Sequence, residues 1–349
     1  MITGPAVDCD IFALGHAVVD VEYEVSHGLL RDLGFTAGGR YLLDDGQFQI
    51  LHAALQAPGA GATWIAQSGG GSAANSVVTA QRLGARCHFA SKLAQDAAGW
   101  FYQQTLLNEG IMIPDAPLAE GISGHCLVLI TPDAERTMLL HLGVTTQLDT
   151  GLLDLDALQR ARSLYLESYL VTDPVARNTV NSALTTAHQA GVPVCISLSD
   201  AGIVTAWRDT LKHWFAPRVS TLIGNESEAL AWGATDQLDK ALDKLAPLAE
   251  QIVITRGAAG VIIVDRSGQT IIEAPKVSAV SSLGAGDTFA GALLHGLHYE
   301  RWPLARSADF ASRCAARKVE FNGPRLAREQ LVWMYSQFTE SGGPARQQG

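Results

Sequence analysis

The chain has little charge, few aromatic residues and only scattered cysteines. Charged residues make up 17% of its 349 residues, and aromatic residues make up 7%. The five cysteines are odd in number and lack C-x-x-C spacing; they are Cys9, Cys87, Cys126, Cys195 and Cys314. This usage predicts reduced thiols in a core and argues against a disulfide framework or a zinc site. The ten histidines show no H-x-x-x-H spacing, which also argues against a histidine metal site.

The sequence also lacks an excess of basic residues. Lysine and arginine number 25 against 35 acidic residues, giving a formal net charge of −10. This balance argues against nucleic acid or an anionic membrane as the main partner. Residues 1–10 contain no basic segment, and no apolar run approaches the roughly 18 residues of a membrane span. We therefore expect a cytoplasmic protein whose anionic ligands meet a local positive site or arrive with a metal ion.

Apolar residues make up 47% of the chain, enough for a large core. From about residue 160 onward, short β-rich runs alternate with helical segments. The expected strands are 164–166, 192–196, 221–223, 252–254 and 261–264, and the expected helices are 174–190, 203–216 and 226–249. This alternation predicts an α/β fold of three layers, α/β/α, with a mostly parallel central sheet. In such sheets, ligands bind beyond the carboxyl ends of the strands.

The N-terminal half contains two groups of half-exposed strands. A buried strand is expected at 11–15, helices at 74–84 and 97–110, and a strand between them at 88–91. Alternating apolar and polar residues predict a half-exposed strand at 18–25 and a hairpin of 125–130 with 136–140. We assign segments 16–48 and 122–142 to a small β-sheet lid on a single catalytic domain, 1–340. The tail 341–349 is expected to be disordered.

A Gly-Ala-Gly-Asp turn lies near the C-terminal end, at residues 284–287, and leads into an apolar helix of small residues. The N–H groups of Gly284, Ala285 and Gly286 collect there with the positive helix end, which suits a phosphate group. Asp287 is then a catalytic base beside this anion hole, or it is the N-cap of the helix, a common role for aspartate. This segment alone leaves the two readings evenly matched.

A second glycine cluster, at residues 69–76, has the sequence Gly-Gly-Gly-Ser-Ala-Ala-Asn-Ser. Gly70 and Gly71 allow a ligand to lie against the backbone, and Asn75 offers both a donor and an acceptor. These groups suit sugar hydroxyls better than phosphate. A glycine turn with Ser72 or Asn75 capping a helix fits the same residues. The spacing is not that of a P-loop.

Two charged residues of the expected lid are further candidates. Asp20 lies where the first strand leaves the core, so its carboxylate is placed to bind a pair of hydroxyls, or it is an exposed strand acid. Arg136 begins the second strand of the hairpin and is either a mobile cation or a solvated residue.

Two loops after expected strands suit a nucleotide and its metal ion. Asn225 and Glu228 lie three residues apart at a helix start, where they could organise a water-coordinated Mg²⁺ or simply cap the helix. Thr255, Gly257 and Gly260 lie between two apolar strands, in a loop for nucleotide phosphates or a plain hairpin turn.

In this order, the segments resemble the ribokinase-like (PfkB-type) family of sugar and nucleoside kinases. The motifs are G-G-S-A-A-N at 70–75, N-x-x-E at 225–228, T-x-G-x-x-G at 255–260 and G-A-G-D at 284–287. The match extends over roughly residues 10–325. The stretches 14–20, 165–170 and 197–200 and the hairpin with Arg136 look most similar to the adenosine-kinase-like branch.

The resemblance implies transfer of the γ-phosphoryl group of ATP to a hydroxyl group. It implies that Asp287 is the base, that 284–286 form the anion hole and that Arg136 reaches the transferring phosphate. Substrate hydroxyls then meet Asp20, Gly70, Gly71, Ser72 and Asn75. ATP meets Asn225, Thr255, Gly257 and Gly260, and Mg²⁺ is held through water by Asn225 and Glu228.

The chain departs from the family pattern in one motif. Family members commonly carry Asp-Thr before the G-A-G-D motif, where this chain has Ser281-Ser282. Loss of that acid leaves the dependence on a monovalent cation such as K⁺ in question.

We expect a nucleoside kinase that makes a 5′-monophosphate from adenosine or a related purine nucleoside. The alternatives are a kinase for ribose, fructose or a similar sugar and a non-catalytic nucleoside-binding protein. The sequence is compatible with a monomer or a homodimer.

Overall fold

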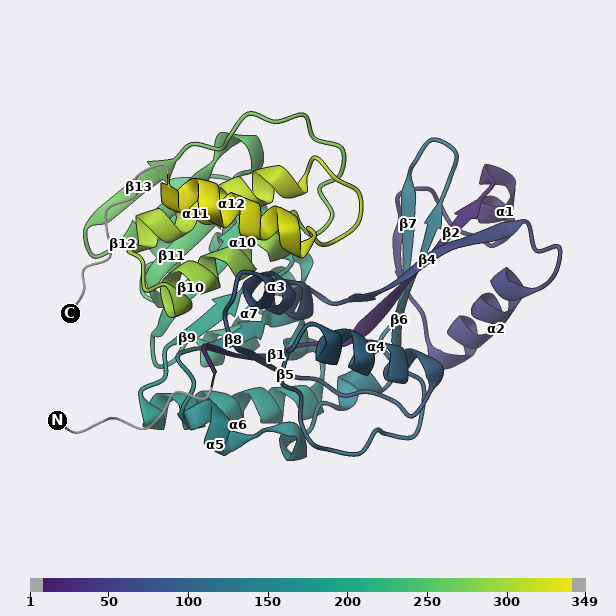
Figure 1. The fold of residues 1–349 in the computed structure, drawn as a ribbon, viewed down its shortest axis with the longest axis horizontal. Helices are drawn as coiled ribbons and strands as arrows, with labels where there is room; N and C mark the ends of the chain where they lie inside the picture. Colours follow the sequence, from purple (N-terminus) through teal and green to yellow (C-terminus); the bar gives the residue numbers. More distant parts are fainter. Residues whose placement is uncertain (1–8, 341–349) are drawn as a thin grey trace.

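The computed structural model describes residues 9–340, which contain two separate β-sheets. The predicted tail at 341–349 lies outside the described residues. Figure 1 shows the larger sheet within a body of helices and the smaller sheet projecting to one side. The larger sheet has the order β13-β12-β11-β10-β9-β8-β1-β5. It is parallel from β11 to β5, whereas β12 and β13 are antiparallel. The predicted fold class is confirmed.

The strands of the larger sheet are mostly short and apolar. They are β1 (Ile11–Leu14), β5 (Cys87–Ala90), β8 (Leu164–Glu167), β9 (Val194–Ser197), β10 (Val219–Asn225), β11 (Ala249–Thr255), β12 (Val261–Asp265) and β13 (Gly268–Ile272). The predicted strands are confirmed to within a few residues at each end. The edge strand β13 was not predicted, because its residues are mostly exposed and polar.

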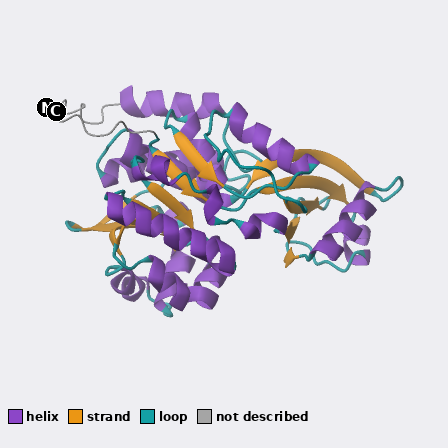
Figure 2. Ribbon diagram, turned by 90° about the horizontal axis from the view of Figure 1, so that it is seen from below, coloured by secondary structure: helices purple, strands orange, loops and turns teal. Residues whose placement is uncertain are grey.

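Alternate residues of the central strands enter two different cores, since successive side chains point to opposite faces of a sheet. Ile11 and Ala13 of β1 pack in one core, and Phe12 and Leu14 pack in the other. The helices divide in the same way, as Figure 2 shows from below. The first core is covered by α3 (Ser72–Arg82), α4 (Ala97–Asn108), α10 (Ala285–Leu294), α11 (Leu304–Lys318) and α12 (Arg328–Glu340). The second is covered by α5 (Leu155–Gln159), α6 (Pro174–Ala190), α7 (Ala201–Trp214), α8 (Glu226–Gly233) and α9 (Leu238–Leu245).

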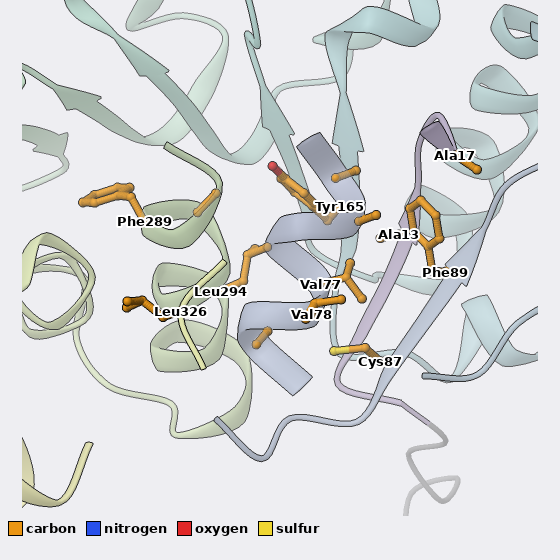
Figure 3. Close-up of a cluster of buried hydrophobic side chains, with 14 of the residues drawn as sticks. Ala13, Ala17, Val77, Val78, Cys87, Phe89, Tyr165, Phe289, Leu294 and Leu326 are labelled. Carbon is orange, nitrogen blue, oxygen red and sulfur yellow. The ribbon is translucent and has the colours of Figure 1, made fainter. Parts of the chain in front are cut away.

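Helix α3 lies at the centre of the first core. Figure 3 shows its Val77 and Val78 beside Leu294 at the end of α10 and beside the sheet residues Tyr165 and Phe89. Gly291 of α10 lies so close to α3 that an added side chain would collide with the Ser76 carbonyl. The two helices that carry the glycine motifs are therefore fixed against each other by close packing.

The single helix expected at 226–249 was wrong. Two helices, α8 and α9, occupy this segment, and residue 249 already belongs to β11. Helix α8 ends because Ala234 adopts a left-handed conformation with φ of 44°. Gly233 then allows close packing on Ala241, since an added Cβ would lie 2.9 Å from the Ala241 Cα. The chain folds back at this contact.

The smaller sheet has the order β3-β7-β6-β2-β4. Its strands are β2 (Val18–Val25), β3 (Arg40–Leu42), β4 (Ala62–Gly70), β6 (Gly124–Ile130) and β7 (Arg136–His141). The predicted strand at 18–25 and the hairpin are confirmed. Strand β4 belongs to this sheet although it lies outside segments 16–48 and 122–142. Helices α1 (His27–Asp32) and α2 (Asp45–Gln56) connect β2, β3 and β4.

The two faces of the smaller sheet differ. Val19, Val21 and Tyr23 of β2 share a core with Phe48 and Leu51 of α2. Asp20 and Glu22 alternate with these residues, so they lie on the opposite face. On that face the register partner of Asp20 is Cys126, and the partner of Cys126 is Leu140.

Candidate active site

The candidate residues gather beyond the carboxyl ends of the parallel strands. Strand β1 leads to His16, β8 ends at Glu167, β10 ends at Asn225 and β11 ends at Thr255. Asn225 and Thr255 are register partners, so they lie side by side. Both glycine motifs lie at helix starts, and Asp287 of α10 contacts α3. The structure therefore places these groups where an α/β sheet binds ligands.

Asp287 is a half-buried residue in the first turn of α10. Gly284, in a left-handed conformation with φ of 73°, is the N-cap, so the cap interpretation of Asp287 is wrong. The carboxylate instead accepts a hydrogen bond from Ser72 Oγ at 2.7 Å and another from Asn75 Nδ2 at 2.8 Å. Burial raises the pKa of Asp287, while these hydrogen bonds and the positive charge of Arg325 oppose the increase.

The first turns of α3 and α10 thus face each other through side chains. The N-cap of α3 is Gly71, which has no side chain, so the capping roles considered for Ser72 and Asn75 are also wrong. Both side chains are directed to Asp287 instead. At the start of α10, the Ala285 N–H donates to the Ser282 carbonyl at 3.1 Å, whereas Gly286 and Asp287 lie in the first turn, whose N–H groups lack helical partners.

Glycine is required at two positions beside Asp20. Gly71 has φ of 93°, and an added Cβ would collide with the carbonyl oxygen of His16. At Gly70 an added Cβ would collide with the carboxylate of Asp20. Tyr102 of α4 fixes this turn from behind, because its hydroxyl donates to the Gly70 carbonyl at 2.8 Å.

Asp20 is not an ordinary exposed strand acid. Burial raises the pKa of Asp20 to about 7, Arg325 opposes the increase, and the charges of Glu22 and Asp287 add to it. Asp20, on β2 of the smaller sheet, and Asp287, on helix α10, therefore interact electrostatically. A carboxylate beside an open glycine turn can accept hydrogen bonds from a pair of hydroxyls.

Two residues of this cluster were missed by the sequence motifs. The Arg325 Nε donates to Asn75 Oδ1 at 2.7 Å. Glu167, which is 1% exposed, accepts hydrogen bonds from the backbone N–H groups of His16 at 2.7 Å and Ala73 at 2.8 Å. It therefore ties the loop after β1 to the start of α3. Burial raises the pKa of Glu167 to about 7. An acid at the end of the apolar run 164–166 was the available signal.

Arg136 lies on the smaller sheet at the start of β7. Its Nη1 is 3.7 Å from Glu22 Oε1, and this nitrogen is buried with no hydrogen-bond partner. Glu22 follows Asp20 by two residues on the same face of β2. Arg136 is therefore neither fully solvated nor bound to Asp287 in this structure, and its role as a mobile cation stays a prediction.

The capping interpretation of Asn225 and Glu228 is confirmed. Asn225 Oδ1 accepts from the Glu228 N–H at 2.9 Å, and Glu228 Oε2 accepts from the Asn225 N–H at 3.0 Å. Asn225 Nδ2 also donates to Glu228 Oε1 at 2.6 Å. Burial raises the pKa of Glu228 to about 7. Each carboxylate oxygen is already an acceptor, so this pair fits a hydrated Mg²⁺ better than direct coordination.

The loop after β11 connects two antiparallel strands, so it is also a hairpin connection, as one reading expected. Residues Gly257–Ala259 form a short 3-10 turn in it. Gly257 has φ of 54°, and Gly260 has φ of 89° with no room for a Cβ beside the Ile272 carbonyl. The loop lies next to Asn225. A role in phosphate binding is compatible with this turn and stays a prediction.

The sequence argues against metal sites, disulfides and membrane-spanning helices. From residue 9 to residue 340, no His, Cys, Asp and Glu side chains form a group of three that could hold a metal ion. All five cysteines lie in this range, and all are buried, as expected of thiols in a core. In the same stretch, no helix is long and apolar enough to cross a membrane. The Oγ of Ser281 accepts from the Leu283 N–H at 3.3 Å, which stabilises the loop before Gly284.

Solved structures with this combination of sheets define the class of protein. A probable sugar kinase from Rhizobium etli superposes with a TM-score of 0.84 at 23% identity, covering 95% of this chain and 98% of the other. The adenosine kinase of Sinorhizobium meliloti superposes with a TM-score of 0.83 at 25% identity, covering 94% and 99%. The fold is thus the ribokinase-like fold expected from the motifs.

The family follows from the sequence. Residues 62–330 match the model of the pfkB family of carbohydrate kinases, and the chain belongs to this family. It is 27% identical to an aminoimidazole riboside kinase of Salmonella typhimurium over 270 residues, covering 74% of this chain and 84% of the relative. It is 28% identical to an Escherichia coli fructokinase over 273 residues, covering 74% and 88%. The chain is therefore a nucleoside or sugar kinase, a phosphotransferase that uses ATP and a hydroxyl acceptor.

Proposed function

We propose that this chain transfers the γ-phosphoryl group of ATP to the 5′-hydroxyl of a nucleoside, adenosine or a related purine nucleoside. The observation that carries the proposal is the apolar surface beside Asp20. Val18, Cys126 and Val128 form a separate apolar cluster, against which Ile130, Met138 and Leu140 pack partly buried. These residues share the face of the smaller sheet that carries Asp20. An apolar surface next to a hydroxyl-binding acid suits a planar base attached to a ribose.

The proposed chemistry uses side chains that already contact one another. Asp287 accepts the proton of the acceptor hydroxyl while the new oxygen–phosphorus bond forms and the bond to ADP breaks. Ser72 and Asn75 orient its carboxylate from the other helix. The backbone of Gly284, Ala285 and Gly286 is the proposed anion hole, facing the charge that would develop on the transferring phosphoryl group; the Ala285 N–H donates to the Ser282 carbonyl in this structure. Such transfer depends on positioning and on charge stabilisation more than on covalent chemistry.

The nucleotide is proposed to bind at the neighbouring strand ends. Thr255 and Gly257 would hold ATP phosphates, and Asn225 with Glu228 would hold a hydrated Mg²⁺, which neutralises phosphate charge when bound. A putative ribokinase II from E. coli, which is 18% identical to this chain, was solved in complex with ATP and Mg²⁺. Closure of the smaller sheet would exclude water and bring Arg136 toward the phosphoryl group.

A sugar kinase is the second candidate, because the similarity does not separate the two. The fructokinase at 28% identity and the riboside kinase at 27% are almost equally similar to this chain. Both substrate classes offer a primary hydroxyl and a neighbouring diol. They differ in whether a base is present to contact the apolar face of the smaller sheet.

A panel of acceptors separates the candidates. The purified chain is assayed with ATP and Mg²⁺ against adenosine, other purine nucleosides, aminoimidazole riboside, ribose and fructose, with product mass determined directly. We expect kcat/KM for at least one nucleoside to exceed that for the free sugars by more than tenfold. Turnover of free sugars without turnover of nucleosides would contradict the proposal. Tight nucleoside binding in a thermal-shift assay without any transfer would instead support a non-catalytic binding protein.

A further inference from the structure

Arg325 is a half-buried cation of the candidate site that none of the kinase motifs contains. It lies in the Gly-Pro-Arg segment between α11 and α12. Its Nε donates to Asn75 Oδ1 at 2.7 Å, and Asn75 Nδ2 donates to Asp287 Oδ2 at 2.8 Å. A guanidinium, an amide and a carboxylate thus form one chain of hydrogen bonds. These hydrogen bonds allow the Asn75 amide only one orientation, since a flipped Asn75 would place its NH₂ group against the guanidinium.

The backbone around Arg325 is fixed by two neighbours. The carbonyl of Pro324 lies so close to Gly284 that an added Cβ there would collide with it. The guanidinium of Arg82, on α3, donates to the Leu326 carbonyl and pairs with Glu109. The arginine is therefore positioned by the turn that starts α10 and by α3, the two elements that carry Asp287 and Asn75.

The charges around Asp287 give Arg325 a second role. Asp20 from β2 and Glu167 and Tyr165 from β8 face Asp287, and each interacts with its charge. Arg325 is the cation that acts on both Asp20 and Asp287 and favours their ionised forms. Its Nη2 is also buried without a hydrogen-bond partner. Unpaired buried donors are rare, and a ligand oxygen would satisfy this one.

We propose that Arg325 positions both the base and the acceptor: it fixes the Asn75 amide that holds Asp287, and its free Nη2 donates to an oxygen of the acceptor. This inference rests on the proposed function and adds a residue to it. The positive charge offsets one of these two carboxylates, and the remaining negative charge disfavours an anionic acceptor, so the site is suited to a neutral, hydroxyl-bearing one.

Replacement of Arg325 tests the role through the pH profile. Arg325→Met removes the charge and every donor, and we expect kcat at pH 7 to fall roughly 10- to 100-fold, as for the loss of a charged hydrogen bond. The loss should shrink at higher pH, because without the cation the base ionises at higher pH. Arg325→Lys keeps the charge, so the pH at which kcat falls on the acidic side of the profile should stay the same. The KM for the acceptor should rise. Arg328→Met, three residues away and paired with Glu109, is the control.

Three results would overturn the proposal. The first is an Arg325→Met variant with one constant loss at every pH, which is what a structural defect alone would give. The second is activity equal to that of Arg328→Met. The third, which still decides the matter if the methionine variant does not fold, is an Arg325→Lys variant with an unchanged KM for the acceptor.

A measurement without turnover keeps this test separate from that of the proposed function. If the wild-type chain phosphorylates no acceptor, the proposed function fails and Arg325 is judged on the titration of Asp287. The carboxyl carbon of Asp287 is followed by ¹³C NMR in the wild type and in Arg325→Met, with Asp287→Asn to assign the signal. We expect a higher pKa for Asp287 in Arg325→Met. An unchanged pKa would rule the inference out.

Discussion

Asp287 combines partial burial with two hydrogen bonds from neutral donors, Ser72 and Asn75. Burial raises its pKa and makes it a stronger base, whereas the hydrogen bonds and the positive charge of Arg325 oppose the increase. A general base works best when its pKa lies near the operating pH. Because the pKa is raised, we expect activity to be lost at a higher pH than an ordinary aspartate would give, which a profile of kcat against pH measures.

Asp287→Asn tests this base directly. Asparagine has nearly the same shape but cannot accept the proton, so we expect kcat to fall by several orders of magnitude, beyond the roughly 10²–10⁴ typical of losing a general base. Steady-state kinetics measure the loss, and Asp209→Asn, at an exposed helix residue, serves as the control. A variant that keeps near-normal kcat would refute the assignment.

The sequence predicted Asp287 and Asn75 because each lies in a continuous glycine motif. Arg325 could not be found in this way, since its position depends on how the segment after α11 returns to Gly284. Glu167 gave a weaker signal, because an acid at the end of a strand is usually exposed to solvent. A motif identifies residues that lie close together in the sequence. Arg325 and Glu167 become functional candidates only through contacts with residues that are distant in the sequence.

The start of α3 is the element on which the acceptor side of the site depends. Gly71 gives the turn its positive φ, Glu167 binds the Ala73 N–H, and Ser72 and Asn75 project from the first turn. This turn allows the acceptor to approach the backbone at Gly70 and Gly71. A change in its path would move Ser72 and Asn75 away from Asp287.

Gly71→Ala should destabilise the protein and reduce its activity. The backbone of Gly71, with φ of 93° and ψ of 131°, lies in a region that costs a non-glycine residue about 1–3 kcal/mol, and overpacking against the His16 carbonyl adds about 1–3 kcal/mol. Urea unfolding followed by circular dichroism measures the sum. Gly59→Ala is the matched control, because Gly59 has φ of 79° with nothing within 4 Å of an added Cβ. Equal destabilisation of the two variants would show that the collision is relieved.

Elements were predicted well where apolar periodicity is strong and less well where packing decides. The strands 164–166 and 221–223 and the helix 174–190 follow from their patterns, and α6 has the predicted bounds. The break between α8 and α9 depends on Gly233 packing on Ala241, a contact that periodicity does not report. Strand β4 was missed because its burial does not alternate: three consecutive residues, 63–65, are exposed, and the two buried residues, Gly69 and Gly70, are neighbours at its end.

At the scale of the whole molecule, the candidate site is shared by two sheets. The larger sheet and its helices supply Asp287, Asn75 and Arg325, and the smaller sheet supplies Asp20 and an apolar face. Movement of the smaller sheet would therefore change acceptor contacts more than the contacts among Asp287, Ser72 and Asn75. This division predicts that substitutions on the smaller sheet will change the kinetics for the acceptor and leave the KM for ATP unchanged.

Met138→Gln separates the two contributions. Met138 is partly buried on the apolar face, as the register partner of Val128, and a polar amide there should weaken contact with a base. Half of the burial energy of a methionine side chain is about 1 kcal/mol, so we expect kcat/KM for the nucleoside to fall roughly 5-fold. The KM for ATP and the unfolding free energy measured in urea should change little. Ile50→Gln, at an α2 side chain that is 75% exposed, is the control. An equal fall for ribose would show that the substitution disturbs the site as a whole and that this face does not recognise a base.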